Sequence, residues 1–163
     1  MKKQKGFSLI ELLIVVAIIL IIAAIAIPNL LRSRIAANEA SAVGSVRTIN
    51  TSEVTYSSTY GTGFAPLVNM GGAGAQCAPP TAANACLLDD TLAQAPHQKS
   101  GYIFATPNPA APGTTAAPNV IYQVTGNPIT AGQTGTRHFF SDESGVIRFN
   151  ATAPATSNDA PLQ

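Results

Sequence analysis

Charged side chains are scarce in this chain. Only 10% of its 163 residues are Asp, Glu, Lys or Arg, against about 25% in an average globular domain. Nine basic and eight acidic residues give a formal net charge of +1, so the chain has no basic stripe with which to bind nucleic-acid phosphates. The sequence therefore predicts no specific nucleic-acid partner.

Cysteine and histidine are also rare. The two histidines, His97 and His138, are distant in sequence from each other and from the cysteines, Cys77 and Cys86, so no metal-ligand spacing is formed. We interpret His138 as a structural or surface histidine. The sequence contains neither a glycine-rich phosphate loop nor a nucleophile elbow. We therefore expect no enzymatic activity, no cofactor and no metal.

The chain does contain a long apolar run near its N-terminus. Between Phe7 and Ile27 the only polar residues are Ser8 and Glu11. As a helix, this run would be about 31 Å long and would match a hydrocarbon core of about 30 Å. The sequence therefore predicts a helix that crosses a lipid bilayer.

Basic residues predict the orientation of this helix. Lys2, Lys3 and Lys5 precede the apolar run, whereas Arg32 and Arg34 follow it. An excess of basic residues marks the cytoplasmic side of a membrane helix. We expect a single-pass anchor in the cytoplasmic (inner) membrane, with its N-terminus in the cytoplasm.

Glu11 distinguishes this segment from an ordinary anchor. A carboxylate at membrane depth costs about 2.5–3.5 kcal/mol even on lenient insertion scales, so it normally marks a function and requires a partner. Cleavage after Gly6 would give Phe7 an α-amine with a reference pKa of about 7.7–8.0. That amine would lie one helical turn from Glu11 and could pair with it, within one chain or between neighbours. The alternative is a shallow acid that snorkels or is protonated.

Residues 6–12, which read GFSLIEL, resemble the processing site of type IV prepilins and pseudopilins. The resemblance implies that a prepilin peptidase cleaves after Gly6 and N-methylates Phe7. It also implies that Glu11 pairs with the terminal amine of a neighbouring subunit during assembly. Pro28 lies where many pilins carry a helix-distorting proline. The resemblance is strong over residues 1–60 and only architectural beyond them.

This resemblance predicts a structural subunit that polymerises through its apolar helix into a type IV pilus-like surface filament. The expected partners are copies of the same chain, prepilin peptidase, the inner-membrane assembly machinery and, before assembly, the lipid bilayer. The alternative is a pseudopilin of a type II secretion system, in a periplasmic pseudopilus. A more remote alternative is ordinary signal-peptidase cleavage after Ala24-Ile25-Ala26, which would release a secreted binding module that starts at Ile27.

The expected fold is α+β, with a long N-terminal helix packed against a small antiparallel sheet, as in pilins. The expected segments are a basic leader (1–6), a helix (7–60) with an apolar half (7–27) and an amphipathic half (28–60), a loop region (61–99), a sheet (100–150) and a flexible tail (151–163). Removal of the leader would reduce the nine basic residues to six, against eight acidic ones.

Periodicity predicts the helix and its buried stripe. The stripe residues recur at helical spacing; they are Ile35, Ala42, Val46, Ile49, Tyr56 and Tyr60. Gly61 and Gly63 have the chemistry of a helix C-terminus. Pro28 removes one helical hydrogen bond, so we expect a kink or a melted turn near it.

Alternation and turn residues predict four short strands. These strands are residues 101–105, 120–125, 136–141 and 146–150. The last two flank a turn-like tetrad at 142–145, which predicts a hairpin.

Cys77 and Cys86 are the only cysteines. In an exported chain such a pair is expected to form a disulfide, worth about 3 kcal/mol or somewhat less for so short a loop. Its place between the helix and the sheet departs from the pilin pattern, in which a disulfide often lies near the C-terminus. Some pseudopilins bind calcium through loop carboxylates, so Asp89, Asp90 and Asp142 are a minor alternative as calcium ligands.

Overall fold

The structure is a computed structural model that describes residues 7–162. The chain divides into two compact units, one that ends at Arg34 and one that begins at Ile35. The fold is α+β, as expected: a long N-terminal helix is followed by three short helices and a five-stranded antiparallel sheet.

Helix α1 (Leu9–Tyr60) has 52 residues and includes Pro28. The helical assignment is unbroken through Pro28, so the melted turn that we considered is not present, and that alternative was wrong. The helix ends as the glycines predict: Gly61 adopts a φ of +64°, and its N–H donates to the carbonyl of Ser57 at 3.0 Å. This left-handed residue closes the last turn at little steric cost.

The first unit contains the apolar part of α1. In the described part of the chain, α1 is the one helix long and apolar enough to cross a membrane, judged by length and composition. The large apolar side chains of this part are exposed to solvent within the single chain, with exposed fractions between 43% at Leu31 and 77% at Leu9. No described residue of this unit covers them, because the unit is the helix itself.

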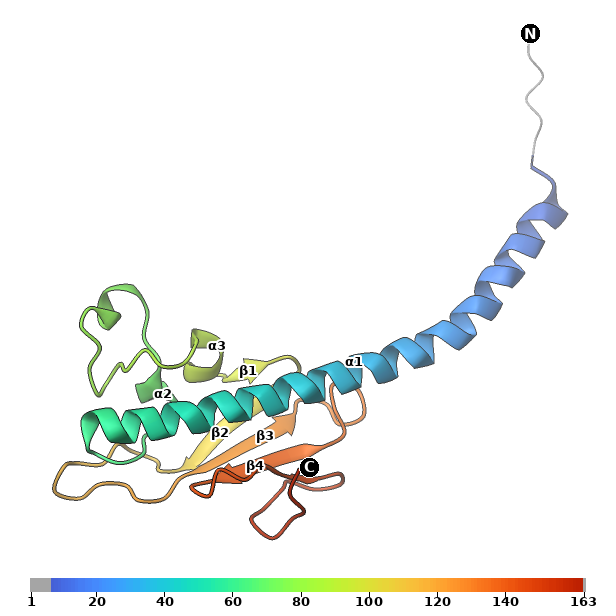
Figure 1. The fold of residues 1–163 in the computed structure, drawn as a ribbon. Coiled ribbons are helices and arrows are strands. Elements are labelled where there is room, and N and C mark those ends of the chain that lie inside the picture. Colours follow the sequence, from blue (N-terminus) through green and yellow to red (C-terminus); the bar gives the residue numbers. More distant parts are fainter. Residues whose placement is uncertain (1–6, 163) are drawn as a thin grey trace. The chain divides into compact units, whose positions relative to one another are not determined.

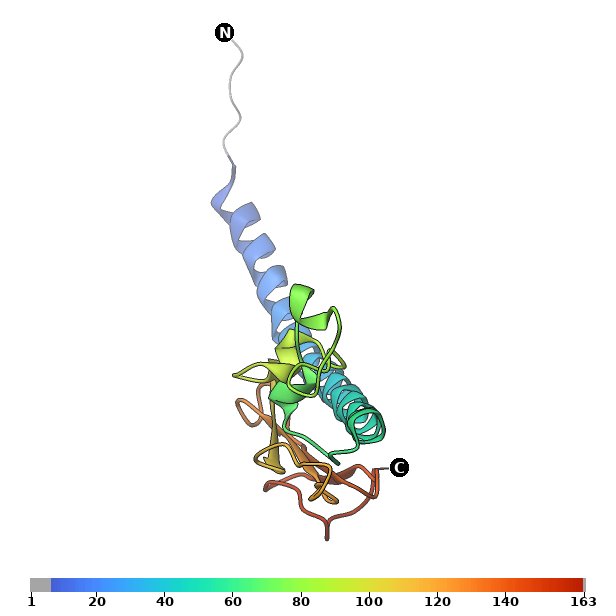
Figure 2. The ribbon, with the colours of Figure 1, turned by 90° about the vertical axis from the view of Figure 1, so that its left-hand side faces the viewer.

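In the second unit the C-terminal half of α1 lies across one face of the sheet (Figures 1 and 2). The strand order is β1-β2-β3-β4-β5, and every pair is antiparallel. The strands are β1 (Gln98–Lys99), β2 (Tyr102–Asn108), β3 (Gln123–Pro128), β4 (His138–Asp142) and β5 (Arg148–Asn150).

The predicted antiparallel sheet and its hairpin are confirmed. The hairpin turn between β4 and β5 is closed by the N–H of Gly145, which donates to the carbonyl of Asp142 at 2.8 Å. The strand boundaries differ from the prediction by up to three residues, and β3 begins only at Gln123. Strand β1 was not expected, because two residues carry no alternating pattern.

The predicted stripe of α1 forms much of the core. Ala42, Val46, Ile49 and Tyr56 are fully buried, whereas the two ends of the stripe are only half-buried. The sheet allows a close approach at Gly126, where a Cβ atom would lie 3.1 Å from the ring of Phe104. A side chain at this position would therefore crowd Phe104 of the neighbouring strand β2.

The region between helix and sheet has more structure than the expected loop. It contains α2 (Leu67–Met70), the 3-10 helix η1 (Gly74–Cys77) and α3 (Asp90–Ala93). Asp89 caps α3, because its Oδ1 accepts the N–H of Leu92 at 3.0 Å. The other oxygen of Asp89 pairs with Lys99 of β1 at 2.7 Å, which ties this region to the edge of the sheet.

The C-terminal tail also makes contacts that we did not expect. The N–H of Leu162 donates to the carbonyl of Ile147 at 2.7 Å, and the N–H of Phe149 donates to that of Ala160 at 3.1 Å. The side chain of Asn150 donates to Asp159 at 2.8 Å. The tail therefore lies along β5, where we had expected a flexible segment.

Candidate assembly and processing site

The candidate processing site lies at the start of the described chain. Gly6, after which cleavage is predicted, lies outside the described residues. Phe7 is 80% exposed and precedes the first turn of α1. Both roles in processing stay predictions.

Glu11 has a hydrogen-bond partner within its own chain. The backbone N–H of Ser8 donates to Oε2 of Glu11 at 2.9 Å, and the N–H of Leu12 donates to the carbonyl of Ser8 at 3.3 Å. Ser8 is the N-cap residue, just before the first residue of α1. A carboxylate three residues after the N-cap can accept the otherwise unpaired backbone N–H of the N-cap residue. The sequence contains the Ser-x-x-Glu pattern of a capping box at residues 8–11, but we did not predict a cap from it. The pairing of Glu11 with a neighbouring subunit stays a prediction.

Next to Glu11, α1 presents an apolar groove. Its volume is about 420 Å³, and its lining residues alternate in steps of three and one along the helix; they are Leu9, Leu12, Leu13, Val16, Ala17 and Leu20. This spacing is a continuous helical face. Such a face can receive the side chains of another helix laid alongside it, as ridges fit into grooves.

Two buried glutamates on α1 were missed at the sequence level. Glu39 and Glu53 are 5% and 0% exposed. They occupy the two seven-residue gaps in the predicted stripe, between Ile35 and Ala42 and between Ile49 and Tyr56. With them, the buried positions recur every three or four residues from Ile35 to Tyr60. The regular spacing was the available signal, but we did not expect carboxylates in a buried stripe.

Both carboxylate oxygens of Glu39 accept hydrogen bonds from the residues just before β4. Its Oε1 accepts from the N–H and hydroxyl of Thr136 at 2.9 and 2.7 Å and from the N–H of Arg137 at 3.1 Å. Its Oε2 pairs with the Arg137 guanidinium at 2.7 Å. Burial alone would raise the pKa of Glu39, but the hydrogen bonds from Thr136 and Arg137 outweigh it and hold the pKa below its ordinary value. Glu39 therefore attaches α1 to the start of β4.

The carboxyl group of Glu53 has fewer hydrogen-bond partners than that of Glu39. Its Oε2 accepts the N–H of Ala65 at 3.1 Å, whereas its Oε1 is buried without a hydrogen-bond partner among the described residues. Burial raises the pKa of Glu53 to about 7, although the Ala65 amide acts in the opposite direction. Glu53 thus differs from Glu39, because no cation of residues 7–162 pairs with its carboxylate.

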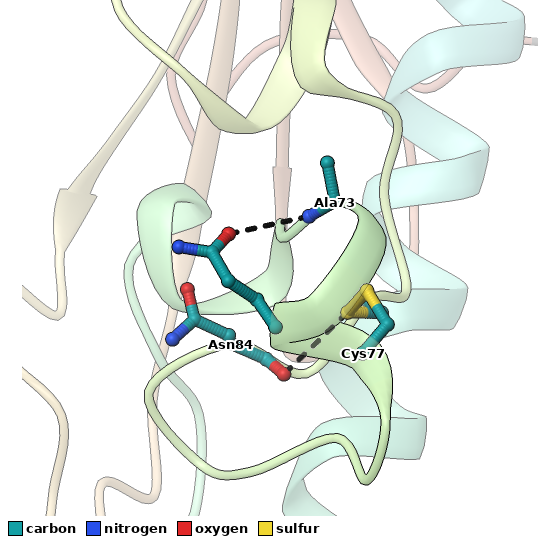
Figure 3. Close-up of a disulfide and its surroundings, with 5 residues drawn as sticks. Ala73, Cys77 and Asn84 are labelled. Atoms are coloured by element: carbon teal, nitrogen blue, oxygen red, sulfur yellow. Dashed lines mark hydrogen bonds between the residues drawn. A yellow bond between two sulfur atoms is a disulfide. The ribbon is translucent and has the colours of Figure 1, made fainter.

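The predicted disulfide is present between Cys77 and Cys86 (Figure 3), with Cα atoms 5.9 Å apart. It closes the loop that follows η1. Gly72, with a φ of +132°, allows this packing, because a Cβ atom there would lie 2.7 Å from the Cys86 sulfur. The N–H of Ala73 donates to the side chain of Gln76 at 3.3 Å, next to the disulfide.

Two of the three carboxylates considered as calcium ligands, Asp89 and Asp142, have structural partners. Asp89 caps α3 and pairs with Lys99, and Asp142 accepts the N–H of Ser144 at 3.0 Å in the β4–β5 turn. Among residues 7–162, no group of three or more His, Cys, Asp or Glu side chains is placed to hold a metal ion. His138 makes a hydrogen-bond contact of 2.8 Å with Asn127 of the adjacent strand.

Comparison with known proteins agrees with the N-terminal features. A family model described as "Prokaryotic N-terminal methylation motif" matches residues 1–27. The chain is also 64% identical over 39 residues to the type IV wide pilus major component PilA4 of Thermus thermophilus. That match covers 24% of this chain and 30% of the relative. No solved structure matches the chain.

The two matches, the exposed apolar helix and the α+β arrangement agree with one another. The methylation motif covers the leader and the apolar run, including Phe7 and Glu11. The resemblance seen in the sequence is thereby confirmed for the N-terminal region. The N-terminal region of this chain carries the prokaryotic N-terminal methylation motif and is similar in sequence to the same region of a type IV pilin.

Proposed function

We propose that this chain is the structural subunit of a type IV pilus-like filament and that it polymerises through the apolar part of α1. The observation that carries the proposal is that one part of α1 is buried by the rest of its own chain and another part is exposed. Residues 9–31 expose nearly all their apolar side chains, whereas the stripe from Ala42 to Tyr56 is buried under the chain's own sheet. An apolar surface of this extent requires a cover from outside the chain.

The proposed cover changes during the life of the subunit. Lipid covers the apolar residues while the subunit is anchored in the inner membrane, and the helices of other copies cover them in the filament. Both environments keep the apolar surface out of water, which is worth about 25 cal/mol per Å². Assembly therefore never exposes this surface to water.

Processing would prepare the subunit for this transfer. Prepilin peptidase would remove the leader after Gly6 and methylate the new terminus at Phe7. The inner-membrane machinery would then add the subunit to the filament, where Glu11 would pair with the terminal amine of a neighbour. In this proposal the chain has no enzymatic role, in keeping with the structural role of the pilin family.

The N-terminus of the mature chain tests the proposal directly. Mass spectrometry of the protein from sheared surface filaments should find a chain that starts at methylated Phe7. A mature chain that starts at Ile27 would contradict the proposal, because signal peptidase would then have released a secreted module without the apolar helix.

The type of filament is a finer question. We favour a surface pilus over a secretion pseudopilus because the loops of the second unit are long and polar, and because the pilin relative is named as a major pilus component. Deletion of the gene should remove surface filaments and leave protein secretion unchanged. Loss of secretion with intact surface filaments would instead indicate a pseudopilin.

A further inference from the structure

Glu53 is a buried acid that the filament function does not use. It lies on the sheet-facing side of α1 and is 0% exposed. Its Oε2 accepts one hydrogen bond, from the N–H of Ala65 at 3.1 Å, and its buried Oε1 accepts none from the described residues. An ionised carboxylate in this position would bury one oxygen without any hydrogen-bond donor from the described residues, at a high cost in free energy.

No cation in the described part of the chain compensates for this burial. The titratable groups that interact with Glu53 are the phenols of Tyr56, on the same helix, and Tyr122, just before β3. Within residues 7–162, the ion pairs are Lys99 with Asp89 and Arg137 with Glu39. Burial accordingly raises the pKa of Glu53 to about 7, from 4.5 in water.

The hydrogen bond of Glu53 attaches the segment that leaves α1, which we call the exit segment (residues 61–66). The same segment is held at Phe64, whose N–H donates to the carbonyl of Asn119 at 3.0 Å. The side chain of Asn119 donates in return to the carbonyl of Phe64 at 2.9 Å, and the Phe64 ring packs on Tyr122 with centroids 4.6 Å apart. The hydrogen bond from the N–H of Ala65 to the side chain of Glu53 joins the exit segment to the helix.

We propose that Glu53 is a proton-dependent latch that holds the exit segment on α1 when the carboxyl is protonated and releases it when the carboxyl ionises. On release, the proton passes to solvent and the carboxylate becomes hydrated. The amide of Ala65 then exchanges its bond to Glu53 for a bond to water. Helix α1 and the sheet stay in place, because the Glu39 contacts and the apolar stripe do not depend on Glu53.

The direction of the pH effect follows from linkage. The open state has an ordinary carboxyl, with a pKa of 4.5, and the closed state has a pKa of about 7. Opening is therefore hardest below pH 4.5, becomes easier by about tenfold per pH unit as the pH rises, and levels off above about pH 7.

Hydrogen exchange at Ala65 tests the latch in the full chain in detergent micelles. After correction for the intrinsic pH dependence of exchange, protection of the Ala65 amide should fall by about fortyfold between pH 5 and pH 7 and then level off. Glu53→Gln should abolish this dependence and keep the amide protected at all pH values. The control Glu143→Gln, at an exposed acid of the β4–β5 turn, should behave as wild type.

Two results would overturn the proposal. One is a wild-type protection that does not change between pH 5 and pH 7, and the other is the same pH dependence in Glu53→Gln. Should Glu53→Gln fail to fold, infrared difference spectra of the wild-type chain with labelled glutamate decide the matter. A protonated carboxyl band that titrates near pH 7 supports the latch, and its absence contradicts it.

Discussion

The two parts of helix α1 obtain their cover in different ways. From Ala42 to Tyr56 the helix buries its stripe under the sheet of the same chain, and a stripe residue such as Ile49 is 0% exposed. From Leu9 to Leu31 the same helix has no cover among the described residues, and Ile19 is 58% exposed. One part is completed by folding, whereas the other can be completed only by lipid or by another molecule.

The polar residues follow the same division. Glu39 is matched by Thr136 and Arg137 of its own chain, so its stabilisation belongs to the fold. Glu11 accepts from the Ser8 amide in the single chain, and its proposed partner belongs to a neighbour. Substitutions between Ala42 and Tyr56 should therefore change the free energy of unfolding. Substitutions between Leu9 and Leu31 should instead change filament assembly.

The largest effect is expected at Gly6, the predicted cleavage residue. Gly6→Val should block processing, because the peptidase requires a small residue there, and should leave the leader on the chain. We expect no mature chain in a membrane-fraction blot and no filaments in a shear preparation. Thermal unfolding of the second unit should stay unchanged. A mature band of normal intensity would show that Gly6 is not the cleavage residue.

The next effect is expected at Glu11. If Glu11 pairs with a neighbour's terminal amine in the filament core, removing the acid leaves that amine unpaired, at a cost of about 3–5 kcal/mol for a buried pair. Glu11→Val should therefore keep the membrane-anchored monomer and its cleavage after Gly6 but strongly reduce filament yield. A normal yield of filaments from Glu11→Val would mean that the acid has no role in assembly.

A matched pair of isoleucines measures the difference between the two parts directly. Ile49→Ala removes a fully buried side chain and should lower the free energy of unfolding by about 3–4 kcal/mol. Ile19→Ala should leave unfolding of the monomer unchanged, because its side chain is exposed in the single chain. Circular dichroism melts of both variants in detergent provide the measurement. Equal effects on unfolding would contradict the division.

The disulfide should act on the second unit alone. Replacement of both Cys77 and Cys86 by Ser removes a short cross-link and should cost about 2–3 kcal/mol of unfolding free energy in the chain-entropy model. Denaturant titration of wild type, of the double variant and of reduced wild type measures this cost. The reduced wild type should match the double variant, and filament assembly should persist at moderate temperature.

The smallest effect is expected at Glu39, and it should depend on pH. Glu39→Gln keeps some hydrogen bonds to Thr136 but loses the ion pair with half-exposed Arg137, at a cost of about 1–2 kcal/mol at neutral pH. Because folding lowers the pKa of Glu39, its contribution is present at neutral pH and is lost as the pH falls through the folded-state pKa. Melts of both proteins should therefore converge in acid, and a constant difference would contradict this account.

The sequence predicted the elements that have a strong local signal. The apolar run, the stripe from Ala42 to Tyr56, the stop at Gly61, the β4–β5 hairpin and the disulfide all follow from residue type and spacing. These features require no knowledge of distant contacts, which is why sequence reasoning reached them.

The features that sequence reasoning missed depend on distant partners. Glu39 can be buried only because Arg137 and Thr136, almost a hundred residues away, are placed to meet it. Strand β1 forms because Gln98 and Lys99 pair with residues of β2. The C-terminal tail looked flexible by composition, but the amide of Leu162 donates to the carbonyl of Ile147, and the amide of Phe149 in β5 donates to the carbonyl of Ala160. Composition cannot report such pairings.

The hydrogen bond from Ser8 to Glu11 changes how assembly should be viewed. The backbone amide of Ser8 occupies one oxygen of the carboxylate, Oε2, at 2.9 Å, whereas a carboxylate has acceptor sites on both of its oxygens. A neighbour's amine could therefore bind Glu11 without displacing the cap. The cap also restricts the rotamers of Glu11 before any partner arrives, so part of the ordering cost of the proposed contact is met within the single chain. Glu11 is in this sense a preorganised acceptor.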